Sequence, residues 1–116
     1  MSTVNGWSAA HHAVVADILA AYPEVRAGRL FGLPAWFVGK TLFAYVYKEG
    51  VGIRLPAAAQ VLIADPHVTP APRPGRMPLI EWVSVNHPRS EDYYSERATF
   101  ERAIRYAAQL TPGAAT

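Results

Sequence analysis

The fold is decided by residues 29–47, which read RLFGLPAWFVGKTLFAYVY. Apolar and aromatic runs alternate there with short breaks at Gly32 and at Gly39-Lys40. Breaks this short indicate antiparallel hairpins, because parallel neighbours need a long crossover connection. The pattern therefore predicts consecutive antiparallel strands at 29–31, 35–38 and 41–47.

The chain that follows this stretch predicts two more strands, at 51–55 and 79–85, where apolar residues recur. Between them, the segment Pro56–Ala64 predicts a short helix, since proline is favoured at the first helical position. Five prolines in the segment Pro66–Pro78 indicate a stiff, extended loop.

Amphipathic helices flank the strands on both sides. The first, over residues 7–22, places its apolar side chains at the spacing of one helical face, with Asn5 or Ser8 as the N-cap. The second, Ser90–Leu110, has a serine as its N-cap and a buried face of aromatic and aliphatic side chains.

These elements together predict one α+β domain over residues 1–116. The expected architecture is a two-layer sandwich, in which an antiparallel five-stranded sheet is covered by helices mainly on one face. The expected order along the chain is α-β-β-β-β-α-β-α.

Composition excludes several classes of protein. Hydrophobic residues make up 51% of the 116 residues and charged residues 17%, which excludes a disordered chain. There is no cysteine, so disulfides, thiolate zinc sites and cysteine nucleophiles are excluded together. Residues 1–6 lack the pattern of a signal peptide, and no apolar run reaches the roughly 20 residues that cross a bilayer. We therefore expect a cytoplasmic protein.

Aromatic side chains are concentrated in the predicted strands. Strict alternation in residues 41–47 predicts Phe43, Tyr45 and Tyr47 on the sheet face that the helices leave open. A contiguous apolar face of this kind favours a two-fold symmetric homodimer, with a flat ligand or stacked bases as alternatives. The predicted ligand or partner surface consists of Trp36, Phe43, Tyr45, Tyr47, Arg54 and Glu81.

Glu81 is unusual because it lies on an otherwise apolar strand, and Arg54 holds a similar place on the preceding strand. A carboxylate in such a position is either paired or has a raised pKa. The two interpretations are an ion pair of Glu81 with Arg54 or Lys40, and a polar group that lines a pocket.

No motif of established chemistry is present. His11 and His12 are adjacent, so they point about 100° apart on a helix and cannot bind one metal ion from the same face. Residues 39–41 match only the end of a phosphate-binding loop, in a strand–turn–strand context. We therefore expect no catalytic residue, no cofactor and no metal.

Arginines in the proline-rich loop and on the last helix form the one basic cluster. Arginine suits phosphate contacts, but acidic residues are interleaved with the arginines of the helix and dilute their positive field. Weak nucleic-acid contact is therefore the second alternative function, through Arg73, Arg76 and Arg105.

Several motifs resemble one known family. Residues 29–44 are similar to the FG-x-P and GK-x-FA pattern of TfoX/Sxy N-terminal-like proteins, and GIRLP at 52–56, PGRMP at 74–78 and EWVSV at 81–85 match its next elements. The related MmcQ/YjbR-like proteins share much of this layout. The resemblance runs from about Ala9 to Leu110 and implies a cytoplasmic bacterial α+β domain.

The resemblance implies a role in regulation, because the TfoX/Sxy proteins regulate competence genes, and it supplies no catalytic residues. We therefore expect a small non-enzymatic binding or regulatory module. The first alternative is a small-ligand-binding or enzymatic domain that uses a pocket between the sheet and the proline-rich loop.

Overall fold

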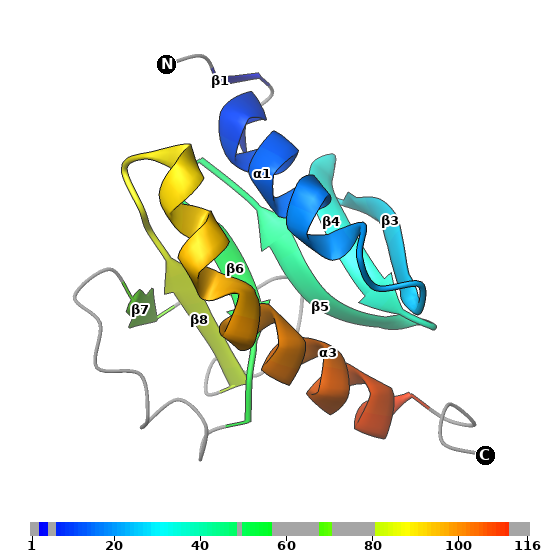
Figure 1. The fold of residues 1–116 in the computed structure, drawn as a ribbon. Coiled ribbons are helices and arrows are strands. Elements are labelled where there is room, and N and C mark those ends of the chain that lie inside the picture. The colour runs from blue at the N-terminus through cyan, green and yellow to red at the C-terminus, as the bar shows by residue number, and fades with distance from the viewer. Residues whose placement is uncertain (1–2, 5–6, 49, 57–67, 71–80, 112–116) are drawn as a thin grey trace.

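The computed structural model describes residues 3–4, 7–48, 50–56, 68–70 and 81–111. These residues have an α+β fold with an antiparallel sheet, as predicted. The helices α1 (Ala9–Leu19) and α3 (Arg97–Leu110) lie across the same face of the sheet, as Figure 1 shows. A separate short hairpin of β1 (Thr3–Val4) and β2 (Trp7–Ser8) precedes α1.

The main sheet has six described strands in the order β3-β4-β5-β6-β8-β7, and all its neighbouring strands are antiparallel. The strands are β3 (Val25–Leu30), β4 (Leu33–Val38), β5 (Thr41–Val46), β6 (Val51–Arg54), β7 (Val68–Pro70) and β8 (Trp82–Val85). The outermost strands are therefore β3 and β7, and the first predicted strand begins earlier than expected, at Val25.

The proline-rich segment is where the prediction needs correction. All five predicted strands are in the sheet, but β7 is a sixth strand, and it comes from the segment Pro66–Pro78 that was expected to be a loop. Proline lacks an N–H group, so it is tolerated on an edge strand, and Pro70 lies on such an edge. The predicted helix Pro56–Ala64 lies outside the described residues, except for Pro56. Residues 66–67 and 71–78 of the proline-rich segment also lie outside them.

The helix termini differ from each other in how they are capped. The Ser8 hydroxyl accepts a hydrogen bond from the His11 amide and caps α1, as predicted. The predicted helix Ser90–Leu110 instead begins with a 3₁₀ helix, η2 (Ser90–Glu96), before α3. Ser90 makes no capping bond, because its hydroxyl lies 2.6 Å from the His11 ring nitrogen Nδ1.

A β-bulge changes which face the β5 side chains occupy. Phe37 pairs with Leu42 and Trp36 with Ala44, so Phe43 is the extra residue of the bulge. The bulge breaks the strict alternation, and Phe43 packs in the helix-covered core instead of on the opposite face. The predicted grouping of Phe43 with Tyr45 and Tyr47 is therefore wrong.

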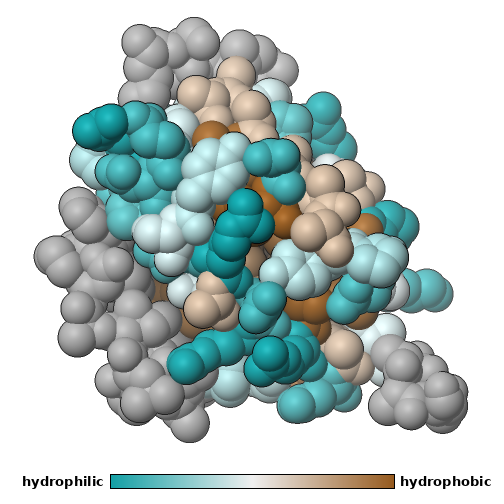
Figure 2. Space-filling model, in the orientation of Figure 1, coloured by the Kyte–Doolittle hydropathy of each residue, from teal (hydrophilic) through white to brown (hydrophobic). Residues whose placement is uncertain are grey.

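The sheet separates two apolar clusters. The larger cluster lies between the sheet and the helices and includes Phe43, Ile53 and Phe100, each fully buried. Figure 2 views this helix-covered side, where polar side chains dominate the surface and hydrophobic ones show between them. The smaller cluster lies on the opposite face and includes Tyr45 and Trp82. Gly52, opposite Tyr45 on β6, leaves room for the tyrosine ring, which a Cβ atom at position 52 would strike.

The smaller cluster bears on the expected homodimer. Tyr45 and Trp82 are only 3% and 1% exposed within a single chain. The open aromatic face from which the dimer was inferred is therefore closed at these two residues. The homodimer itself stays a prediction.

Candidate functional site

The strongest candidate site is a groove between α1 and the β3–β4 hairpin. It has a volume of about 260 Å³ and is widely open to solvent. The lining residues are His12, Ala27, Gly28, Arg29, Pro34, Ala35 and Trp36. We call this depression the α1–β3 groove.

The groove is lined by His12 of α1 on one side and by residues of β3 and β4 on the other. Figure 1 shows α1 beside β4, with β3 beyond it at the sheet edge. Val25 packs against the helix-side cluster, so alternation places Ala27 and Arg29 on the same face of β3. Ala27 pairs with Trp36 of β4, and the short side chain of Ala27 leaves space beside the indole.

Aromatic rings form the wall on the helix side. The His12 ring lies 5.7 Å from the Trp36 ring and is tilted by 36° to it. On its other side, His12 meets Trp7 of β2 edge-on, with ring centroids 5.3 Å apart. Trp36 is buried and part of the core, so this wall is fixed by the packing of the fold.

Arg29 supplies the positive charge of the groove. Its guanidinium carbon lies 5.9 Å from the centroid of the Trp7 ring, and its Nη1 donates a long hydrogen bond of 3.4 Å to the Gly32 carbonyl oxygen. Burial of the His12 imidazole lowers the pKa of that group, and the charge of Arg29 lowers it further. The lowered pKa favours the neutral form of His12 at pH 7, in which the ring can hydrogen-bond without adding a second charge.

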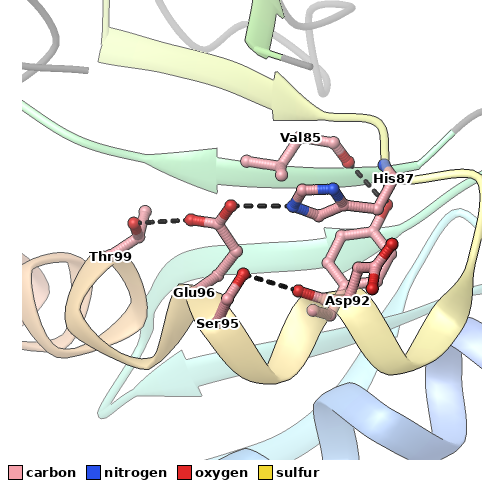
Figure 3. Close-up of polar contacts among 7 residues, drawn as sticks. Val85, His87, Asp92, Ser95, Glu96 and Thr99 are labelled. Atoms are coloured by element: carbon pink, nitrogen blue, oxygen red, sulfur yellow. Dashed lines mark hydrogen bonds and ion pairs between the residues drawn. The ribbon is translucent and has the colours of Figure 1, made fainter. Parts of the chain in front are cut away.

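A buried polar cluster joins α1, η2 and the end of β8. His87 Nε2 lies 2.8 Å from Glu96 Oε2, and Thr99 donates a hydrogen bond to the other oxygen of the same carboxylate (Figure 3). The Tyr93 ring is packed edge-on between the rings of His11 and His87. Glu96 is one of the acidic residues interleaved with arginines in the predicted last helix, and it is buried, with 9% of its surface exposed.

The His11 ring predicts a pH dependence of stability. Burial and the nearby His87 lower the pKa of His11 below its ordinary value of 6.5, although a hydrogen bond to the His87 backbone opposes the shift. The unfolded chain therefore binds this proton more tightly than the folded chain. We expect the free energy of unfolding to be constant well above pH 6.5 and to fall as the pH drops below it.

Urea titrations at a series of pH values between about 8 and 5 measure this decline across the ordinary histidine range. His11→Gln cannot take up the proton, so its decline is expected to be shallower than that of the wild type. A wild-type stability that rises as the pH falls through this range would contradict the assignment.

The remaining predicted surface residues do not share one surface. Trp36 lies in the α1–β3 groove, whereas Phe43 is fully buried among the helix-side residues. Tyr45 and Tyr47 are on the opposite face, with ring centroids 5.7 Å apart. Four of the six predicted residues are thus divided among three places, and only Trp36 lines the groove.

Arg54 and Glu81 form the expected ion pair. Arg54 Nε and Nη2 donate to Glu81 Oε1 at 3.0 and 2.6 Å, and the Tyr106 hydroxyl donates to Oε2 at 2.9 Å. The hydrogen bonds from Arg54 lower the pKa of Glu81, burial opposes this shift, and the bond from Tyr106 adds to it. The pair joins the end of β6 to the residue before β8, which is a structural role.

The predicted nucleic-acid residues are only partly described. Arg73 and Arg76 lie outside the described residues. Arg105 is exposed on α3, 3.9 Å from Glu101, and lines a second depression of about 250 Å³ with Arg102 and Tyr106. Because Arg105 already faces a carboxylate, it adds little positive field for phosphate binding.

Comparisons with known proteins find no match for this chain, neither among family models nor among curated proteins or solved structures. The resemblance to TfoX/Sxy N-terminal-like proteins therefore stays a prediction. No helix in the described part of the chain is long and apolar enough to span a bilayer. Within the same residues, no group of three or more histidine or acidic side chains is placed to hold a metal ion.

Proposed function

We propose that this protein is a small, non-enzymatic binding module that takes up a small molecule in the α1–β3 groove. The observation that carries the proposal is the convergence of Trp36, His12 and Arg29 on one open depression of about 260 Å³. Small-molecule sites are concave and mostly apolar, with few polar groups that fix orientation. The groove has these properties.

The volume also limits the ligand. Sites for drug-sized molecules enclose roughly 300–1,000 Å³, so a groove of about 260 Å³ fits a compact one- or two-ring molecule. The proposal assumes the predicted two-layer sandwich, in which the helices do not cover the outermost strand β3. A regulatory role, as the TfoX/Sxy resemblance implies, would follow from ligand binding at this edge.

A thermal-shift panel of metabolites, nucleotides and small acids tests the proposal, because a ligand that binds only the folded state raises the melting temperature. Ala27→Phe fills the groove from an exposed strand position where an aromatic side chain is well tolerated. We expect compounds that stabilise the wild type to lose their effect in this variant.

Ala98→Phe is the matched control, since Ala98 is exposed on α3 and does not line the groove. It is expected to respond to the same compounds as the wild type. Stabilisation that persists in Ala27→Phe would place the binding site elsewhere and overturn the proposal. A panel without any stabilising compound would also count against it.

A further inference from the structure

We propose that the α1–β3 groove is specific for flat carboxylic acids, with the ring of the ligand against His12 and Trp36 and its carboxylate on Arg29. This inference rests on the proposed function and names the class of ligand. Three features of the groove support it: the charge of Arg29, the charge of the whole lining and the shape of the wall.

The first feature is that Arg29 has no carboxylate partner among the described residues. Three other arginines form ion pairs: Arg54 with Glu81, Arg89 with Glu91 and Arg105 with Glu101. Within the described residues, Arg29 instead donates one hydrogen bond, the 3.4 Å contact from Nη1 to the Gly32 carbonyl oxygen. The guanidinium carbon lies 5.9 Å from the centroid of the Trp7 ring, and Arg29 lines the groove. A guanidinium group in this state is suited to bind a carboxylate with two parallel hydrogen bonds.

The second feature is the net charge of the lining. Among the described residues that line the groove, Arg29 is the one formally charged group, and none is acidic. His12 remains neutral at pH 7 because burial and the charge of Arg29 oppose its protonation. One positive charge matches the single negative charge of a carboxylate better than the higher charge of a phosphate monoester.

The third feature is the shape of the wall. The His12 and Trp36 rings both line the groove, with centroids 5.7 Å apart and planes tilted by 36°, and Trp36 is 4% exposed. Pro34 and Ala27 add short apolar surfaces. A flat ring packs closely against a wall of aromatic and short apolar side chains, whereas a branched or sugar-like molecule contacts less of it.

Calorimetric titration with benzoate and indole-3-carboxylate, and with the corresponding neutral amides, tests the inference. The acid and the amide of each pair have nearly the same shape, so a difference between them reports the charge. We expect each acid to bind the wild type about tenfold or more tighter than its amide, the ratio typical of a hydrogen bond to a charged group.

Arg29→Gln removes the charge and is expected to reduce the affinity of the acids to that of the amides, while the affinity of the amides stays unchanged. Arg26→Gln is the matched control, because Arg26 is on the same strand but stacks on Phe37 and donates to the Gly39 carbonyl. It is expected to bind the acids as the wild type does.

Equal affinities for acid and amide, or an Arg29→Gln variant that binds the acids normally, would overturn the inference. Absence of binding by both acids would also overturn it. The proposed function would survive either result if another compound still stabilises the wild type and not Ala27→Phe, so the two failures can be told apart.

Discussion

Replacing Trp82 with alanine is expected to lower the free energy of unfolding by about 3–5 kcal/mol, the usual cost of emptying a buried tryptophan site. Trp82 is 1% exposed, and its ring lies 5.5 Å from that of Tyr45 on the sheet face opposite the helices. Its loss leaves a cavity next to the central strands, where the backbone pairs on both sides and cannot collapse freely.

Urea denaturation of the two proteins under the same conditions measures this difference. Phe31→Ala is the control, since Phe31 is a large aromatic residue that is 80% exposed at the β3–β4 turn. It is expected to change stability by less than about 0.5 kcal/mol. A Trp82→Ala variant as stable as Phe31→Ala would show that the smaller cluster, which contains Tyr45 and Trp82, is not a packed core.

The second large effect is expected at Glu96. Its carboxylate accepts one hydrogen bond from Thr99 and lies 2.8 Å from His87 Nε2, and both side chains of the His87–Glu96 pair are buried. Glu96→Ala removes the carboxylate that His87 Nε2 and the Thr99 hydroxyl contact. The His87 ring is buried and loses this partner. We expect a loss of about 1–3 kcal/mol, the cost of an unsatisfied buried polar group.

Glu91→Ala is the matched control, because Glu91 belongs to the same 3₁₀ helix and pairs with Arg89 at an exposed position. Water screens that pair and replaces its hydrogen bonds, so the urea midpoint of this variant is expected to match the wild type. Equal midpoints for Glu91→Ala and Glu96→Ala would contradict the structural role given to the buried cluster.

The sequence was sufficient for five strands of the main sheet, β3 to β6 and β8, because their signals are local. Gly32 and Gly39 have positive φ angles of 82° and 59°, and the turns at these positions separate β3, β4 and β5 as the short breaks predicted. The bulge at Phe43 could not be predicted, since the apolar pattern of β5 is compatible with either face.

Long-range packing determined what the sequence did not show. Glu96 is buried because the end of η2 lies against His87, a contact between elements whose relative position no local pattern specifies. The strand β7 was not predicted because its segment is rich in proline. It lies at the edge of the sheet next to β8, where a missing N–H group costs little.

The candidate site was only partly predictable for the same reason. Trp36 was included in the predicted ligand or partner surface as one of the aromatic residues concentrated in the strands, and His12 was considered only as half of a metal pair. Arg29 belongs to the stretch that decided the fold. Its place in the groove could be inferred only once β3 is known to be the edge strand of the sheet. The groove also needs His12 of α1 next to that edge, a contact between distant parts of the sequence.

The most direct test of the groove follows the indole N–H signals of the chain's three tryptophans in ¹⁵N-labelled protein during titration with indole-3-carboxylate. Trp36 lines the groove and Trp7 contacts His12, whereas Trp82 lies in the cluster on the opposite face of the sheet. Binding in the α1–β3 groove predicts saturable shifts of the Trp36 and Trp7 signals and a stationary Trp82 signal. Stationary signals from Trp7 and Trp36, or a largest shift at Trp82, would contradict it.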